Sequence, residues 1–161
     1  MPSVQKITPC LWFDRNAEEA SNHYVSIFKN SRIVTTSRYG EVGPLPKGTV
    51  LIVIFELEGQ RFMGLNGGPL FKFSEAISMM VACDTQDEID AFWEKLSAGG
   101  EKGRCGWLKD RFGVSWQVVP SMLSELMSGD GAPGNRVMTA LMRMNKLDIA
   151  ALRRAGDSAA A

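Results

Sequence analysis

The segment Cys105–Pro120, CGWLKDRFGVSWQVVP, holds several side chains that are able to contact a small molecule. Trp107 and Lys109 alternate along the chain, so they share one face of any strand on which they lie. An indole ring beside an ammonium group can stack on and pair with an anionic aromatic ligand. Gln117 carries an amide that both donates and accepts hydrogen bonds, so it could orient a carbonyl or amide group. Each residue also has a purely structural interpretation: a tryptophan at a rim, an exposed lysine, and a glutamine bonded to its own neighbours.

The cysteines Cys10, Cys83 and Cys105 are the candidates for thiol chemistry. Their number is odd and no CxxC motif occurs, so neither a disulfide framework nor a four-cysteine zinc site is expected. Cys105 stands among polar residues, but a nucleophilic thiol needs a nearby base or cation. The single histidine, His23, falls in a predicted helix, and nothing in the sequence places it near Cys105. We expect the thiols to be reduced and packed.

The composition excludes several classes of partner. The chain has 161 residues, 45% of them hydrophobic, which suits one compact domain with an adequate core. Eighteen Lys and Arg residues balance eighteen Asp and Glu residues, so binding to nucleic acid is not expected. No segment approaches the roughly 20 apolar residues of a membrane span, and the first residues do not resemble a secretion signal. We therefore expect a cytoplasmic protein that binds neither nucleic acid nor membranes.

The elements that must position these residues follow a repeated order. A strand over Val4–Phe13 precedes a helix, and Asn16 with Glu19 three residues later is typical of a capping box. Hydrophobic periodicity and turn residues predict the other elements: strands at Arg32–Tyr39, Thr49–Leu57 and Gln60–Leu65, a strand at Ala76–Cys83, a helix at Asp84–Leu96, one or two short strands in Glu101–Asp110, and a strand at Val114–Val119. The chain thus reads β-α-β-β-β twice and is predicted to be an α+β protein.

The chain changes character after Pro120. Met and Leu residues at helical spacing predict short helices, separated by a flexible link at Gly129–Gly134. Asp148 is expected to cap the last helix. We expect a single domain over 1–161, which is built from the modules 4–68 and 75–120 and a C-terminal helical extension, 121–155.

Four stretches carry a resemblance to a known family: CLWFDRNAEEASNHYVSIF, FMGLNGGPLFKFSEAISMMVACDTQDEIDAFWEKLSAGG, CGWLKDRFGVSWQVVP and KLDIAALRRA. They resemble the PhnB-like branch of the vicinal oxygen chelate superfamily, which includes glyoxalase I, extradiol dioxygenases and bleomycin-resistance proteins. The branch often carries the label 3-demethylubiquinone-9 3-methyltransferase. The resemblance implies paired, glyoxalase-like βαβββ modules that curve into a mixed-sheet cup, usually in a homodimer.

The resemblance also implies four positions for a divalent metal ion. In this chain they fall near Pro9, at Met63 or its neighbour Gly64, near Ser78, and at Gln117. A hard or borderline cation prefers imidazole nitrogen and carboxylate or carboxamide oxygen, and only Gln117 offers such a group. We expect no metal at the usual site and no cofactor, although a rearranged site that uses Asn66 or Gln117 stays open.

Strand alternation then predicts the residues that face the cup. If Gln117 points inward, so do Ser115 and Val119, while Trp116 and Val118 pack under the helices. The same reasoning places Pro9, Leu11 and Phe13, and also Ser78, Met80 and Ala82, in the cup. Asn66 ends a strand at the edge of the cup, with a turn residue as the alternative interpretation. The predicted ligand-binding residues are Gln117, Trp107, Lys109, Asn66, Ser78, Leu11 and Phe13.

The function that the resemblance implies is less specific than the fold. The glycine-rich stretch Gly64–Pro69 lies between the modules rather than at a strand-to-helix turn, so it does not resemble an S-adenosylmethionine-binding loop. We expect a small-molecule enzyme, such as a lyase, isomerase or transferase, or a binding protein. The first alternative is a metal-free protein that sequesters its ligand, as a resistance protein does. The second alternative is a methyltransferase, as the family label suggests.

Overall fold

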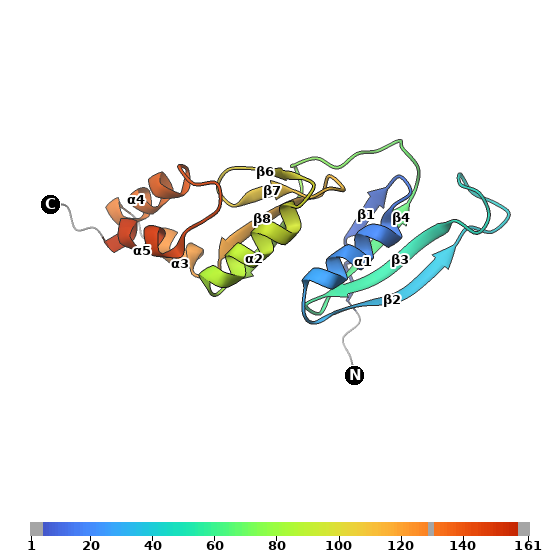
Figure 1. Ribbon diagram of the computed structural model, residues 1–161, viewed down its shortest axis with the longest axis horizontal. Helices are drawn as coiled ribbons and strands as arrows, with labels where there is room; N and C mark the ends of the chain where they lie inside the picture. Colours follow the sequence, from blue (N-terminus) through green and yellow to red (C-terminus); the bar gives the residue numbers. More distant parts are fainter. Residues whose placement is uncertain (1–4, 129–130, 158–161) are drawn as a thin grey trace. The chain divides into compact units, whose positions relative to one another are not determined.

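The computed structural model describes residues 5–128 and 131–157 and divides into two compact units between Phe73 and Ser74. Each unit contains one of the predicted modules, and in each a helix lies along one face of a mixed sheet (Figure 1). Within the described residues, no helix is long and apolar enough to cross a membrane.

The first unit has five elements in βαβββ order: β1 Cys10–Phe13, α1 Ala17–Ile27, β2 Ser31–Arg38, β3 Val50–Leu57 and β4 Gln60–Asn66. Its sheet has the order β1-β4-β3-β2, with β1 parallel to β4 and the other pairs antiparallel. The predicted first strand is too long at its start, because β1 begins only at Cys10. Pro9 has no backbone N–H to donate, although its carbonyl accepts from Met63 N at 2.9 Å.

The second unit repeats this order with β5 Met79–Cys83, α2 Gln86–Ser97, β6 Glu101–Lys102, β7 Trp107–Lys109 and β8 Ser115–Pro120. Its sheet has the order β5-β8-β7-β6, with β5 parallel to β8. Thr85 is the N-cap of α2, and its side chain accepts from the backbone N–H of Glu88. Two sheets of the same topology confirm the predicted α+β class and the repeated module.

The start of α1 differs from its prediction. Asn16 precedes the helix, but its side chain makes no capping hydrogen bond. The N–H of Ala17 instead donates to Oδ1 of Asn66, at 2.9 Å, from the end of β4. The capping box with Glu19 is therefore wrong, because a side chain from a distant strand already fills the position of the cap.

The predicted facing of β1 is also wrong. Leu11 and Phe13 are only 5% and 2% exposed, and Leu11 is paired with Gly64 of β4. A Cβ on Gly64 would lie 3.4 Å from Ala17 Cβ and 3.6 Å from the Phe13 ring, so this row of residues faces α1 rather than a cup. The helix packs closely against the sheet at this glycine. Cys10 and Trp12 consequently lie on the opposite, more exposed face.

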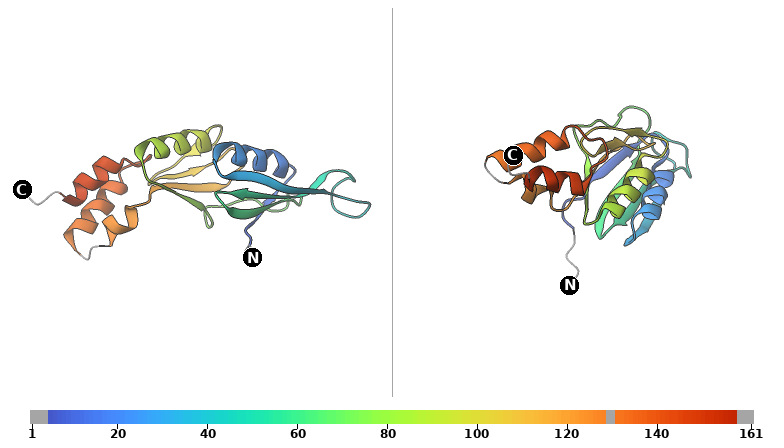
Figure 2. Two further views of the ribbon diagram at one scale, coloured as in Figure 1. Left: turned by 90° about the horizontal axis from the view of Figure 1, so that it is seen from below. Right: turned by 60° about the vertical axis from the view of Figure 1, so that its left-hand side comes forward.

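The core of the second unit follows the prediction more closely. Ile89, Trp93 and Leu96 are the buried apolar residues of α2, and they form the stripe that its spacing predicts. The helix contacts β5, β7 and β8 on one side of the sheet, as the view in Figure 2 shows. Trp116 and Val118 are buried, whereas Gln117 between them is half-buried. This alternation places Gln117 on the face opposite α2.

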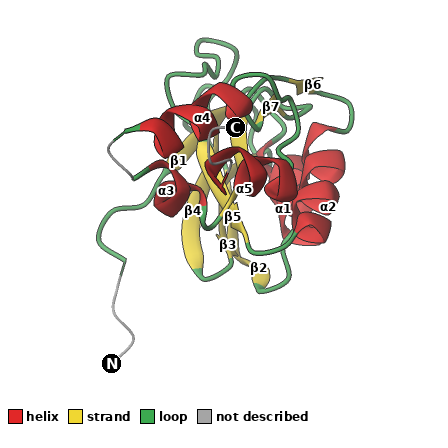
Figure 3. Cartoon of the chain, turned by 90° about the vertical axis from the view of Figure 1, so that its left-hand side faces the viewer, coloured by secondary structure: helices red, strands yellow, loops and turns green. Residues whose placement is uncertain are grey.

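The C-terminal extension consists of α3 Leu123–Met127, α4 Ala132–Leu141 and α5 Ile149–Asp157, which lie together in Figure 3. The predicted link at Gly129–Gly134 is wrong in its second half because α4 already begins at Ala132, and residues 129–130 lie outside the described part. Asp148 caps α5 as predicted, since its Oδ1 accepts from Ala151 N at 2.8 Å. The extension shares a buried cluster with the end of β8: Val119, Val137, Leu141, Leu147 and Leu152.

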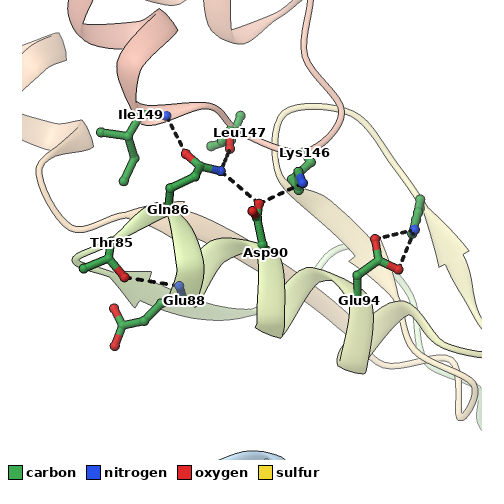
Figure 4. Close-up of polar contacts among 9 residues, drawn as sticks. Thr85, Gln86, Glu88, Asp90, Glu94, Lys146, Leu147 and Ile149 are labelled. Carbon is green, nitrogen blue, oxygen red and sulfur yellow. Dashed lines mark hydrogen bonds and ion pairs between the residues drawn. The ribbon is translucent and has the colours of Figure 1, made fainter.

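A polar network joins the extension to α2 (Figure 4). The amide of Gln86 accepts from Ile149 N at 2.9 Å and donates to Leu147 O at 3.0 Å. It also donates to Asp90, which pairs with Lys146 at 2.7 Å. We refer to Gln86, Asp90 and Lys146 as the Gln86 network.

Candidate functional site

The open face of the second sheet brings together most of the predicted ligand-binding residues. Trp107 of β7 is the direct cross-strand partner of Gln117 in β8, and Met80 of β5 is its partner on the other side. Gln117 Nε2 donates to Ser78 Oγ at 2.9 Å. Trp107, Gln117 and Met80 therefore form one row across this sheet, in which Met80 is 67% exposed, and Ser78, just before β5, joins it through the hydrogen bond to Gln117.

Lys109 and Ser115 form the next pair along the same two strands. Directly opposed residues of an antiparallel pair have side chains on the same face, about 4.5–5.5 Å apart at Cβ. The Lys109 ammonium forms an ion pair with Glu75, at 2.5 Å from Nζ to Oε1. The hydrogen bond to Glu75 raises the pKa of Lys109, and the same bond lowers the pKa of the Glu75 carboxyl.

A small hollow of about 120 Å³ lies beside this second pair. Its lining residues are Glu75, Glu101, Lys102, Gly103, Trp107, Leu108, Lys109 and Ser115. Ser115 is 1% exposed, and within the described residues its Oγ has no hydrogen-bond partner. Because buried hydroxyl groups are nearly always paired, this oxygen is unusual.

The turn before β8 determines how these side chains are presented. Asp110 is 3% exposed, and its Oδ1 accepts from the N–H groups of Phe112 and Val114 at 2.8 and 3.0 Å. Its Oδ2 accepts from Trp116 Nε1 at 2.8 Å. Asp110 was not among the predicted site residues, although an aspartate followed by a glycine at Gly113 is typical of a turn.

The remaining predicted site residues lie in the first unit. Asn66 is 1% exposed, its Oδ1 accepts from Ala17 N, and its Nδ2 donates to Val50 O at 3.0 Å. The Tyr39 hydroxyl donates to the backbone carbonyl of Asn66 at 2.5 Å. Leu11 and Phe13 are buried beneath α1, as described above. The part that these three residues take in ligand binding stays a prediction, whereas their structural contacts are explicit.

The four positions that the resemblance assigns to a metal do not form a suitable set of donors. Pro9 offers only its carbonyl, which already accepts from Met63 N. Met63 carries a thioether, and the side chains of Ser78 and Gln117 are hydrogen-bonded to each other. Among the described residues, no group of three or more His, Cys, Asp or Glu side chains is placed to hold a metal ion. The residues present therefore do not fit a hard divalent cation.

The thiols lie in different environments. Burial raises the pKa of Cys83 to about 12, with Glu88 and Asp84 as smaller causes. Cys10 is exposed, and partial desolvation raises its pKa as well. Cys105 adopts φ 57° and packs against the cluster of the extension, with its backbone N–H bonded to Met144 O at 2.8 Å. The contacts of Cys105 are thus those of a packed turn residue.

The glycine-rich stretch after β4 serves the packing of a tryptophan. A Cβ on Gly67 would lie 2.3 Å from the Trp12 ring, and Trp12 Nε1 donates to Gly68 O at 2.9 Å. The chain then runs on to β5 without entering a helix. An S-adenosylmethionine or nucleotide loop needs a helix N-terminus after the glycines, and this stretch lacks one.

The repeated βαβββ sheets and the open face of the second sheet define a protein of the glyoxalase-like, vicinal oxygen chelate class. The family model described as 3-demethylubiquinone-9 3-methyltransferase matches residues 5–119. The chain belongs to this PhnB-like family, and the predicted family is confirmed.

Solved structures agree with this assignment. The PhnB protein from Bacillus cereus is 42% identical with a TM-score of 0.67, and the match covers 72% of this chain and 99% of that chain. The fosfomycin resistance protein FosX from Mesorhizobium loti is 16% identical with a TM-score of 0.55, and the match covers 78% and 99% of the two chains. FosX from Listeria monocytogenes, solved with Mn(II) and sulfate, is 16% identical with a TM-score of 0.51, over 80% and 98%. The likeness to the FosX proteins shows the fold alone. A comparison with curated proteins found no match to the chain.

Proposed function

We propose that this protein binds a small molecule on the open face of its second sheet, as a ligand-binding protein or as an enzyme that acts on a polar group there. The observation that carries the proposal is the hydrogen bond between Gln117 and Ser78 on a half-exposed face beside Trp107. Ser78 Oγ accepts from Gln117, so its own proton is available for a ligand. The Gln117 carbonyl oxygen can accept, and the indole offers a stacking surface.

The side chains of this face favour binding over proton transfer. Glutamine, serine and tryptophan do not titrate near neutral pH, and the pKa of Lys109 is raised above its ordinary value by Glu75. A general base works best with a pKa near the operating pH. We therefore favour a protein that holds its ligand through Gln117, Ser78, Trp107 and Lys109, without a metal ion or a cofactor.

A ligand screen tests this proposal. Thermal shift with a metabolite panel, with Mn²⁺, Ni²⁺ and Zn²⁺, and with S-adenosylmethionine is measured for the wild type and for Gln117→Ala. We expect a metabolite shift that Gln117→Ala lowers and that Gln60→Ala, an exposed glutamine in the first unit, leaves unchanged. A metal shift that is lost in Gln117→Ala would contradict the metal-free site. Equal shifts in all three proteins would contradict the site itself.

The family description supplies a second candidate, a methyltransferase. The contact between Gly67 and Trp12 argues against the glycine stretch as its cofactor loop. A large S-adenosylmethionine shift, together with methyl transfer to a phenolic acceptor, would support this candidate instead.

We also propose a cytoplasmic homodimer. Its three cysteines are free thiols, which suits a reducing compartment, and large apolar side chains such as Ile77 and Met80 are each 67% exposed. Light scattering at micromolar concentration tests the assembly, and a monomer there would contradict it.

A further inference from the structure

The buried hydroxyl of Ser115 lies beside a hollow without a hydrogen-bond partner among the described residues. Its cross-strand partner, Lys109, projects from the same face and points its ammonium at the carboxylate of Glu75. The hollow is therefore lined by two cations, Lys102 and Lys109, by two carboxylates, Glu75 and Glu101, and by the hydroxyl of Ser115, and Glu75 is the carboxylate that forms the ion pair with Lys109.

Apart from Lys109, the carboxylate of Glu75 is bonded to its own backbone N–H. Its side chain is 60% exposed, and it lies in a turn of the connection between β4 and β5 rather than in a helix or strand. An exposed ion pair of this kind contributes little to stability, so the carboxylate can leave Lys109 for water at small cost. The backbone of Lys109 is fixed more firmly, because Lys109 is a residue of strand β7, which is paired in the sheet.

We propose that Glu75 occupies the place of a ligand carboxylate, and that a carboxylate-bearing ligand binds by displacing Glu75 from Lys109 and accepting a hydrogen bond from Ser115 Oγ. This inference rests on the proposed function, and it names the ligand class of the same face. The incoming carboxylate reproduces the ion pair that it breaks. It also supplies the acceptor that Ser115 lacks, so the exchange favours the ligand.

The other charges of the hollow agree with a carboxylate held by Lys109. Lys102 donates to both oxygens of Glu94, at 2.8 and 3.0 Å, so it is already engaged. Glu101 is a smaller cause of the raised pKa of Lys109. A cationic ligand is disfavoured, because its ammonium group would lie close to the Lys109 ammonium and the like charges would repel each other.

The size of the hollow limits what enters it. About 120 Å³ is several times the roughly 30 Å³ that a water molecule occupies, but it is less than the roughly 300 Å³ at the lower end of ligand pockets. It suits one carboxylate group. The rest of the ligand would extend along the strand direction over Trp107 toward Gln117, which are the next cross-strand pair.

Calorimetric titration with benzoate and with benzamide, its neutral counterpart, tests the inference. Glu75→Gln frees Lys109, and we expect it to bind benzoate about tenfold more tightly than the wild type, with benzamide unchanged. Ser115→Ala should weaken benzoate about tenfold without lowering the melting temperature, because the hydroxyl has no partner to lose. Glu101→Gln is the matched control, because Glu101 is the cross-strand partner of Lys109 on β6 and its substitution removes a charge of the hollow while the ion pair of Glu75 with Lys109 stays in place.

The outcomes separate this inference from the proposed function. The inference is overturned if benzoate binds the wild type, Glu75→Gln and Glu101→Gln with equal affinity. It is also overturned if benzoate does not bind Glu75→Gln. Benzamide binding that is lost in Gln117→Ala supports the proposed site even then. The substitution Glu75→Gln could also raise the benzoate affinity in a protein that carries Gln117→Ala, while no protein binds benzamide. That result would support the carboxylate subsite and contradict the role of Gln117.

Discussion

Asp110 Oδ2 accepts a hydrogen bond of 2.8 Å from the indole Nε1 of Trp116, and both side chains are buried. The same carboxylate closes the turn between β7 and β8 through two backbone N–H groups. With Trp116 held beneath α2, strand alternation turns Ser115 and Gln117 to the open face. Asp110 thus helps to position the candidate site through the turn and Trp116.

Replacement of this carboxylate should destabilise the second unit. Asp110→Asn places an amide NH₂ against one of three N–H donors, and we expect the free energy of unfolding to fall by about 2–3 kcal/mol. Urea denaturation followed by tryptophan fluorescence measures the change. Asp87→Asn, at an exposed position in the first turn of α2, is the control and should cost less than about 1 kcal/mol. Equal effects of the two substitutions would show that the buried network is unimportant.

Asn66 and Asn16 allow a direct comparison of two caps for α1. Asn66→Ala removes the acceptor of Ala17 N and the donor to Val50 O, so we expect a loss of about 2–3 kcal/mol. Asn16→Ala removes a side chain without a capping bond and should change stability by less than about 0.5 kcal/mol. Thermal unfolding by circular dichroism distinguishes them. A larger loss of stability in Asn16→Ala than in Asn66→Ala would show that Asn16 caps the helix, as the local sequence predicts.

Gly67→Ala tests whether the glycine stretch serves packing. The added methyl group would overlap the Trp12 ring, so the ring must move, and we expect a loss of about 1–3 kcal/mol with an altered tryptophan emission. Gly40→Ala is the matched control because no atom lies within 4 Å of its Cβ position. An unchanged stability for Gly67→Ala would argue for a role other than packing.

The Gln86 network should make the attachment of the extension depend on pH. The hydrogen bond from Lys146, followed by the bond from Gln86, lowers the pKa of Asp90. A carboxyl whose pKa is lower in the folded state contributes stability above its unfolded value of about 3.9, and this contribution is lost as the pH falls through the folded value. Because the pair is exposed, we expect less than about 1 kcal/mol.

Melting temperatures of the wild type and Asp90→Asn between pH 2 and pH 6 measure this contribution. The difference between the two proteins should be present at pH 6 and should vanish toward pH 2, whereas Asp87→Asn should follow the wild type. On the alkaline side Asp90 raises the pKa of Lys146, so that contribution is lost only as the pH rises through the raised value. A difference that does not change with pH would mean that Asp90 acts through packing alone.

The order of the elements was predictable because each one is encoded locally. The run TVLIVIFEL and the spacing of Ile89, Trp93 and Leu96 follow from periods of two and 3.6 residues, and the structure places β3 and α2 there. The cap of α5 by Asp148 is also a contact between near neighbours in the chain. The repeat of this order, with the quoted motifs, was sufficient to indicate the family.

The sequence by itself determined which residues alternate with one another, but only the tertiary structure decided which of the two faces is covered. Gln117 and Ser78 lie on the open face of the second sheet, where the Gln117 amide donates to the Ser78 hydroxyl, whereas Leu11 and Phe13, which were predicted to face the cup, are buried beneath α1. Likewise, the cap of α1 comes from Asn66, 49 residues away, and the partner of Lys109 is a turn residue, Glu75. The physical reason is that alternation and helical spacing arise from the local geometry of the backbone, whereas burial and hydrogen-bond partners depend on which distant segments the packed chain brings together.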